Sequence, residues 1–304
     1  MRAFVLFFGL MLAALASIAV FTYPAWLLLH LLWPLLHLHF DFKFHRVGER
    51  IGMLALVIGF VLVARRVGLA DKRSVGYDLP RPLFIREMLV ALGLGVVGML
   101  AIVGIMTALG LLDWTEASTV TGGQLAKIIL NRLASGLAVG FIEETMLRGV
   151  MFAAIQRESG ARTAILLTSI VYSAVHFLSS YHIAPDQVTP YSGLDLLAGT
   201  LHWFSTPLAM ADAFICLFAV GMVLAMIRAR TGNIAACVGL HAGWVWVMLA
   251  AHELTKPVRG QPLSFLLSQF DGFIGWLVFA WTVLMGVVLV RLYSKRTASA
   301  PQEA

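Results

Sequence analysis

The chain has 304 residues, of which 60% are hydrophobic and only 12% are charged, and its mean hydropathy is +0.88. A soluble domain carries roughly 25% charged residues, so this composition excludes a soluble enzyme, a disordered chain and a disulfide scaffold. The net charge is +6. The basic residues lie at the ends of apolar runs, where lipid headgroups account for them, so no nucleic-acid partner is expected.

Apolar stretches of membrane-spanning length follow one another along the chain. Runs of this length with few or no charges are typical of transmembrane helices rather than of the short alternations of a barrel. The runs lie at 3–23, 51–64, 88–112, 126–156, 163–181, 207–227, 232–250 and 268–290. We therefore predict an all-α fold, a polytopic transmembrane bundle of about eight helices.

The segment 24–40 is also apolar but contains two prolines and three histidines. It extends the first helix, forms a re-entrant turn or lies in the membrane interface, and the sequence does not choose among these. An interfacial position for the histidines is favoured over a metal site. The histidines concerned are His30, His37 and His39.

The distribution of Lys and Arg predicts the orientation of the helices. Connections rich in basic residues face the cytoplasm, and the connection 65–87 carries six of them. With that connection inside, fourteen basic residues lie on the cytoplasmic side and six on the other side. The connections 113–125 and 182–206, which have acidic but no basic residues, then lie outside. Both termini are predicted to be cytoplasmic.

The fourth apolar run carries charges where charges are costly. An ionised side chain at the centre of a transmembrane helix costs roughly 2.5–3.5 kcal/mol on insertion scales, yet Glu143, Glu144 and Arg148 lie deep in this run. Glu144 and Arg148 are four residues apart and meet on one face of a helix, so we predict that they pair. Consecutive positions differ by about 100°, so Glu143 points elsewhere and has no counter-ion on its own helix.

Two histidines in later runs lie at depths similar to that of Glu143. Counted from the predicted cytoplasmic helix ends at about 1.5 Å per residue, Glu143 is roughly 21 Å deep, His176 roughly 20 Å and His241 roughly 14 Å. Polar groups inside a membrane are satisfied most economically when they face one interior cavity. We therefore expect a catalytic cavity between the fourth, fifth and seventh helices.

Read in chain order, these residues form three spaced motifs: EExxxR at 143–148, YxxxH at 172–176 and HxxxV at 241–245. Their order and spacing resemble those of the CAAX prenyl protease and bacteriocin-processing (CPBP, or ABI) intramembrane proteases. The pattern of that family is EExxxR, FxxxH, and HxxxN or HxxxD on a series of transmembrane helices. The resemblance covers about residues 126–250, and it implies a peptidase that needs no metal.

Two positions depart from the family pattern. Tyr172 stands where the family has phenylalanine; it keeps an aromatic ring, adds a hydroxyl and is assigned a supporting role. Val245 stands where the family has an asparagine or aspartate thought to assist the site. Either another polar group replaces it or activity is reduced. The candidates nearest in sequence are Asn233, Tyr172 and Ser173.

Peptide hydrolysis needs an activated water, a stabilised oxyanion and a proton for the leaving amine. Glu143, a carboxylate without a local counter-ion, suits the general base. His176 is expected to position the water or polarise the carbonyl, and His241 to stabilise the oxyanion or protonate the leaving amine. Glu144 and Arg148 are expected to hold the helix and its charge balance, which is the division that the resemblance also implies.

Three alternatives stay open. One glutamate and two histidines also match catalytic zinc sites, with Glu143, His176 and His241 as the ligands, although the chain has no HExxH motif. The second alternative is a catalytically silent membrane scaffold or immunity protein, which Val245 supports. A proton-coupled transporter is the third and is disfavoured, because the chain shows no internal repeat.

The sequence divides into three regions: an N-terminal transmembrane region at 1–125, the core that resembles the protease family at 126–250, and a final helix with a tail at 251–304. The expected partners are the lipid bilayer and a hydrophobic or membrane-associated peptide substrate, and no cofactor is expected. Composition and short connections favour a prokaryotic plasma membrane. The identity of the substrate is not contained in these patterns.

Overall fold

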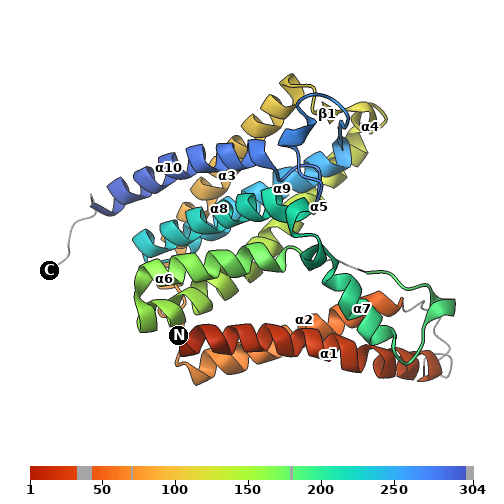
Figure 1. The fold of residues 1–304 in the computed structure, drawn as a ribbon. Helices are drawn as coiled ribbons and strands as arrows, with labels where there is room; N and C mark the ends of the chain where they lie inside the picture. The colour runs from red at the N-terminus through yellow and green to blue at the C-terminus, as the bar shows by residue number, and fades with distance from the viewer. Residues whose placement is uncertain (33–42, 70, 179–180, 299–304) are drawn as a thin grey trace. The chain divides into compact units, whose positions relative to one another are not determined.

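The computed structural model of the chain describes residues 1–32, 43–69, 71–178 and 181–298. Its regular structure is helical except for one pair of two-residue strands (Figure 1). Within the described ranges, seven helical segments are long and apolar enough to cross a membrane. These segments are Arg2–Leu32, Phe44–Arg66, Arg81–Ala108, Gly122–Val175, Pro207–Thr231, Ala235–Leu254 and Trp276–Lys295. The prediction of an all-α polytopic transmembrane bundle is confirmed.

One of these segments, Gly122–Val175 with 54 residues, contains the predicted run 126–156 and most of the run 163–181, which extends beyond Val175. A straight helix of that length would measure about 80 Å, whereas a bilayer core is about 30 Å thick. Gly160 interrupts the segment with a φ of +83°, a left-handed conformation that glycine adopts without strain. The ribbon folds back on itself near the α6 label in Figure 1, so the segment accounts for both predicted runs, 126–156 and 163–181.

The chain forms two compact units. The first contains Met1–Gly68 and Ala174–Leu208, and the second contains Leu69–Ser173 and Ala209–Ala304. Many large apolar side chains on the long helices of both units are exposed, among them Leu54 at 61% and Val97 at 67%. Exposed apolar helix faces of this extent are typical of lipid contact, which agrees with the membrane-spanning lengths.

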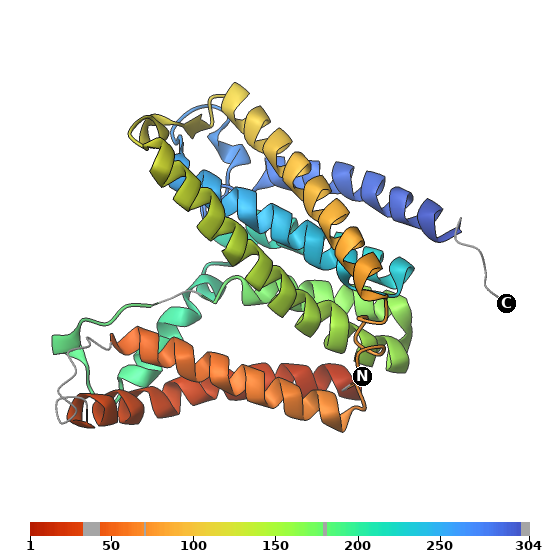
Figure 2. The same cartoon turned by 180° about the vertical axis from the view of Figure 1, so that it is seen from behind.

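The first unit is built on an antiparallel helix pair. Helices α1 (Arg2–Leu32) and α2 (Phe44–Arg66) run side by side, and the short helix α7 (Ser192–Thr200) packs against them (Figure 2). A side chain on Gly193 of α7 would collide with the backbone carbonyl of Ala19, so glycine lets the two helices touch there. Two 3₁₀ turns flank α7, at Pro185–Gln187 and His202–Ser205.

The structure shows the conformation of the first part of the segment 24–40. Helix α1 continues through Pro24 to Leu32, so the first part of this segment extends the first helix. His30 lies in this extension, and its ring contacts Trp26 at 4.0 Å between ring centroids. The remaining positions, including His37 and His39, lie outside the described residues.

The second unit contains most of the remaining helices and the two strands. Its elements are α3 (Arg81–Ala108), β1 (Leu112–Asp113), α4 (Thr115–Ser118), α5 (Gly122–Glu144), η2 (Thr145–Met151), α6 (Phe152–Val175), α8 (Pro207–Thr231), α9 (Ala235–Leu254), β2 (Lys256–Pro257), η5 (Ser264–Leu266) and α10 (Trp276–Ala298). Strands β1 and β2 pair antiparallel, Leu112 opposite Pro257, and so join the chain just after α3 to the chain just after α9.

Helix α9 lies between α3 and α5, and glycines bring the three backbones together (Figure 2). A Cβ on Gly136 of α5 would stand 2.6 Å from the carbonyl oxygen of Ala242, and Gly140 lies one turn further along the same face. On the opposite side of α9, a side chain on Gly239 would collide with the carbonyl of Met88 in α3. Small residues permit this close packing of membrane helices, and it holds α5 and α9 in one register.

Candidate active site

The EExxxR motif lies where α5 passes into η2, a π-helical turn of seven residues. Single π turns within α-helices occur frequently at functional sites. Thr145, the first residue of η2, donates a hydrogen bond from its hydroxyl to the carbonyl of Phe141 at 2.6 Å. The hydroxyl of Tyr77 donates in turn to Thr145, also at 2.6 Å, so the connection before α3 is tied to the motif.

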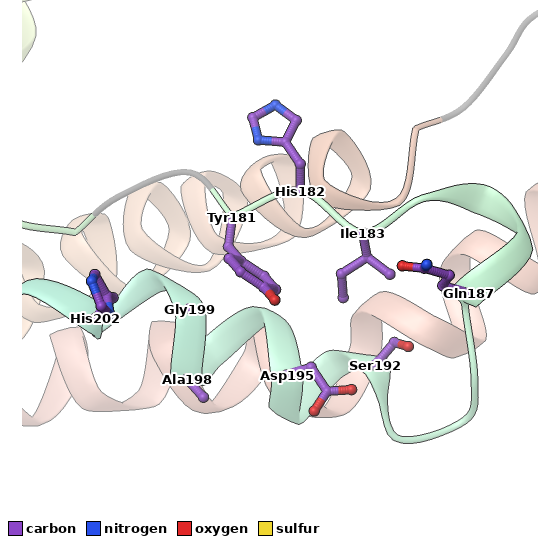
Figure 3. A pocket seen from close by; sticks show the side chains of 9 residues that line it. All are labelled: Tyr181, His182, Ile183, Gln187, Ser192, Asp195, Ala198, Gly199 and His202. Carbon is purple, nitrogen blue, oxygen red and sulfur yellow. The ribbon is translucent and has the colours of Figure 1, made fainter.

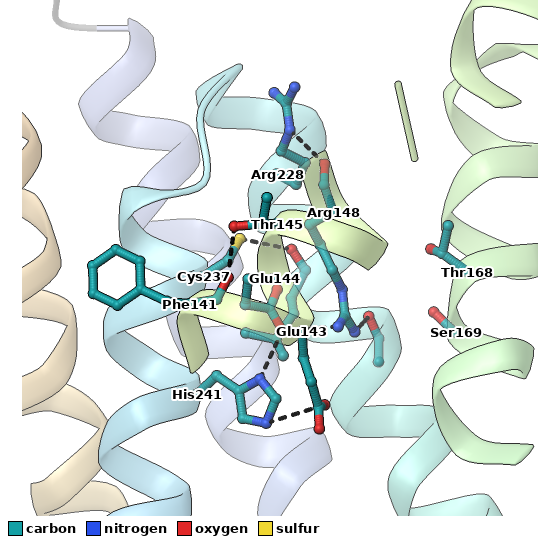
Figure 4. Close-up of polar contacts among 12 residues, drawn as sticks. Phe141, Glu143, Glu144, Thr145, Arg148, Thr168, Ser169, Arg228, Cys237 and His241 are labelled. Carbon is teal, nitrogen blue, oxygen red and sulfur yellow. Dashed lines mark hydrogen bonds and ion pairs between the residues drawn. The ribbon is translucent and has the colours of Figure 1, made fainter. Parts of the chain in front are cut away.

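The predicted pair of Glu144 and Arg148 is present and entirely buried. Arg148 Nη1 donates to Glu144 Oε1 at 2.8 Å, and both side chains have 0% exposure (Figure 4). Arg148 Nη2 also donates to the carbonyl of Gly221 in α8 at 3.2 Å. Its guanidinium carbon lies 4.6 Å from the centre of the Tyr172 ring, a cation–π contact. The pair therefore links three helices as well as balancing its own charge.

His241 makes a contact that the sequence did not reveal. Its Nδ1 lies 2.7 Å from Glu144 Oε1, the oxygen that also accepts from Arg148 (Figure 4). A carboxylate paired with arginine only accepts hydrogen bonds, so Nδ1 carries the hydrogen. In the neutral ring the lone pair is then on Nε2. Glu144 thus orients the imidazole as well as pairing with Arg148.

Glu143 faces the other nitrogen of the same imidazole. The distance from His241 Nε2 to Glu143 Oε2 is 3.9 Å, which is too long for a hydrogen bond. Oε2 is buried and has no hydrogen-bond partner among the described residues, although the Glu143 side chain as a whole is 33% exposed. The imidazole of His241 is therefore held between two carboxylates, bonded to one and open toward the other (Figure 4).

Tyr172 is the aromatic side chain that completes this group. Its ring is 3% exposed and meets the His241 ring edge-on, with centroids 5.8 Å apart and an interplanar angle of 75°. It is also the one of the three candidates for replacing the family's polar residue that contacts the imidazole. The Ser173 hydroxyl donates to the carbonyl of Phe214 at 2.7 Å. The Asn233 side chain donates to the carbonyl of Thr231 at the end of α8 and accepts from the amide of Ala235 at the start of α9.

His176 lies just after α6. The predicted run 163–181 reaches further than the helix, which ends at Val175, and the amide of Phe177 closes a tight turn onto Ala174 at 3.2 Å. His176 belongs to the first unit, whereas Glu143 and His241 belong to the second. Its participation in one site with them stays a prediction from the motif.

A polar cavity lies in the first unit, lined by residues that are not among the predicted site residues. It measures about 460 Å³, and Tyr181, Asp195 and His202 are among the residues that line it. The His182 ring points away from Asp195 (Figure 3). Its centroid lies 3.9 Å from that of the His45 ring, and the two rings are tilted by 49°. Across the described part of the chain, no three His, Cys, Asp or Glu side chains are arranged to hold a metal ion.

Comparison with known proteins identifies one domain. A family model described as type II CAAX prenyl endopeptidase Rce1-like matches residues 125–247. No curated protein and no solved structure matches the chain. The matched range contains all six predicted site residues, which are Glu143, Glu144, Arg148, Tyr172, His176 and His241.

Proposed function

Because residues 125–247 form an Rce1-like domain, the domain of the CAAX protease family, we propose that this integral membrane protein is an intramembrane endopeptidase. Its substrates are hydrophobic or membrane-associated peptides. The observation that carries the proposal is the His241 imidazole, bonded to Glu144 through Nδ1 and open toward Glu143 through Nε2. Buried polar groups are normally hydrogen-bonded, because an unpaired one is costly. Polar atoms that face each other without a bond are therefore better explained by catalysis than by packing.

Glu143 Oε2 and His241 Nε2 are both hydrogen-bond acceptors directed at each other across 3.9 Å. A water molecule has two hydrogens and satisfies both acceptors at once when it lies beside them. Its oxygen is then free to attack a peptide carbonyl. Glu143 is the general base that takes the proton from this water as the new carbon–oxygen bond forms.

Glu144 and Arg148 prepare His241 for this role. The hydrogen bond from Nδ1 to Glu144 fixes both the tautomer and the ring orientation, as carboxylates do for histidines in other catalytic sites. Arg148 offsets the charge of Glu144, so the pair orients the ring without adding net charge to the cavity. Of the two adjacent glutamates, Glu143 is then the one without a cationic partner on its own helix, which suits a proton acceptor.

The reaction closes when the tetrahedral intermediate breaks its carbon–nitrogen bond. The proton held by Glu143 passes to the departing amine, so the proton removed from water leaves with the product. The role proposed for His176 stays the one predicted from the motif, which is to position the water or polarise the carbonyl. The reaction as written uses no metal.

The proposed setting is a prokaryotic plasma membrane with both termini in the cytoplasm. The bias of basic residues toward the connection 65–87 supports this orientation. Tyr77 in that connection is bonded to Thr145, beside the motif, so the predicted cytoplasmic side is the side nearer to η2. Substrates are expected to reach the site from that side.

The test compares wild-type protein with Glu143→Gln in detergent, each incubated with a library of hydrophobic peptides and analysed by mass spectrometry. Cleavage by the variant should fall by about 10²- to 10⁴-fold, the usual contribution of a general base. Folding should be unchanged, since Glu143 Oε2 makes no hydrogen bond that the amide would lose. Glu116→Gln, at an exposed position, is the matched control and should cleave like the wild type.

A chelator arm separates the two chemistries. Cleavage that is lost in Glu143→Gln and unaffected by a strong chelator supports the metal-free reaction, whereas loss of wild-type cleavage on chelation moves the site to zinc. Equal cleavage by the wild type and a folded Glu143→Gln variant contradicts the role of Glu143. Absence of cleavage across the whole library by a folded wild-type protein favours the silent scaffold, the alternative that Val245 supports.

A further inference from the structure

The first turns of α5 carry a polar stripe that the proposed reaction does not use. The residues of the stripe recur at the spacing of one helix face. They are Gln124, Lys127, Asn131 and Arg132, and the apolar Ile128 lies among them on the same face. Most of the surrounding helix is apolar, so four polar or charged side chains on one face require an explanation beyond helix packing.

This stripe lines a cavity of about 360 Å³, which Val120 and Glu253 complete. Glu253 lies near the end of α9 and forms an ion pair with Arg132 Nη2. The cavity exceeds by several times the space of about 30 Å³ that a water molecule occupies in the liquid. It has room for a phosphate group with an attached glycerol.

The cavity has a net positive charge and hydrogen-bond donors without partners. The charged residues that line it are two cations, Lys127 and Arg132, and one anion, Glu253. Lys127 is exposed and has neither a hydrogen bond nor an ion pair within the described ranges. Arg132 Nε is buried and lacks a hydrogen-bond partner there, while Nη2 is held by Glu253. A guanidinium has five N–H donors, so the ion pair orients Arg132 and leaves further donors to a ligand.

Apolar side chains border the stripe on the same turns of α5. Leu125 is 38% exposed, Ile129 39% and Leu130 64%. The indole of Trp246 donates to the carbonyl of Ile129 at 2.9 Å, so a tryptophan also lies at this level. Cations and a tryptophan at the end of an apolar helix are typical of the lipid headgroup region. A ligand that fits both surfaces has an anionic head and an apolar tail.

We propose that this cavity binds the phosphate of an anionic phospholipid. Lys127 and Arg132 contact the non-bridging phosphate oxygens, Glu253 holds the guanidinium in place, and the acyl chains lie along Leu130 and its neighbours. Arg132 and Glu143 are three helical turns apart on α5, roughly 16 Å, so the lipid site is separate from the proposed catalytic site. The inference does not depend on peptidase activity.

The test titrates purified full-length protein in detergent with dioleoyl phosphatidylglycerol or dioleoyl phosphatidylcholine and counts retained lipid by native mass spectrometry. Phosphatidylglycerol should be retained preferentially by the wild type. Lys127→Gln should weaken its binding about fivefold, because one basic residue near lipid phosphate contributes about 1 kcal/mol. Lys127→Arg, which keeps the charge, should bind like the wild type.

Arg50→Gln, an exposed position in α2, is the matched control and should leave retention unchanged. A third arm adds inorganic phosphate: failure to displace the lipid assigns the site to a phospholipid, whereas complete displacement at millimolar phosphate overturns the lipid assignment in favour of a free-phosphate site. Equal retention of both lipids by the wild type and Lys127→Gln overturns the proposal. The variants are expected to fold, because the Lys127 side chain makes no bond that is lost.

Discussion

The two ends of the α5–α9 interface carry ion pairs of similar composition and opposite character. At one end, Glu144 and Arg148 have 0% exposure, and Glu144 also binds His241 of α9. At the other end, Arg132 and Glu253 are 35% and 34% exposed, and they border an open cavity. Gly136, in close contact with α9, lies between the two. The same pair of helices thus holds one cluster rigidly and leaves the other adaptable.

This difference teaches that burial, more than the number of ion pairs, decides what each cluster can do. Removing one partner of a buried pair typically costs 3–5 kcal/mol, whereas an exposed pair contributes about 0–1 kcal/mol. A reactive imidazole needs a fixed orientation, which the buried Glu144 provides. A headgroup site needs donors that can adjust to a mobile ligand, which the partly exposed Arg132 and the exposed Lys127 provide.

The largest loss of stability is expected for Arg148→Met, which disrupts the buried pair. We expect this change to lower the free energy of unfolding by about 3–5 kcal/mol, because it leaves the buried Glu144 without its counter-ion. Equilibrium unfolding in mixed micelles measures the loss. The double variant Glu144→Gln with Arg148→Met should recover part of it, since no buried charge is then left unpaired. A loss below 1 kcal/mol in the single variant would mean that the buried pair contributes no more to stability than the exposed pair.

The second prediction concerns the close contacts that glycines of α5 make with α9. Gly140→Val should destabilise the protein by about 1–3 kcal/mol and reduce peptide cleavage, since a Cβ at this position would stand 3.0 Å from the carbonyl of Val238 and move α9 with His241. Ala138→Val, which introduces the same side chain at an exposed position of the same helix, is the control. Thermal unfolding and cleavage assays report the two effects. Equal behaviour of the two variants would show that α9 is positioned by other contacts.

The anchoring of the motif can be tested by Tyr77→Phe. Loss of the hydrogen bond to Thr145 should cost about 0.5–1.5 kcal/mol of unfolding free energy, while the ring keeps its stacking on Phe84. Tyr191→Phe removes a hydroxyl from a side chain that is 74% exposed and should change nothing measurable. Chemical unfolding of both variants decides the matter, and indistinguishable midpoints would mean that the hydroxyl of Tyr77 adds no stability.

The smallest effect is expected at the exposed pair. A double-mutant cycle of Arg132→Gln and Glu253→Gln should give a coupling energy of about 0.2–1 kcal/mol, and it should shrink as salt is added. The same unfolding assay at low and high ionic strength measures it. A salt-insensitive coupling above 2 kcal/mol would show that this end of the interface is as rigid as the other, and it would weaken the assignment of an adaptable lipid site.

Much of the fold and the local part of the site could be predicted because both depend on relations along one helix. The lengths of the apolar runs set the membrane spans, and Gly160 divides the continuous segment Gly122–Val175 between the two runs predicted there. The pairing of Glu144 with Arg148 follows from helical periodicity alone. The order of the three motifs likewise predicted a resemblance to the CAAX protease family, and a family model described as type II CAAX prenyl endopeptidase Rce1-like matches residues 125–247.

Tertiary structure decided the contacts between helices. Glu144 and His241 are 97 residues apart, and their hydrogen bond depends on the crossing and register of α5 and α9, which close glycine contacts set. Nothing in the spacing of either motif indicates that one carboxylate oxygen accepts from both Arg148 and His241. The end of α6 at Val175, just before His176, was equally absent from the apolar pattern. Periodicity is a property of one helix, whereas the register between helices is settled by side-chain shape at their contact.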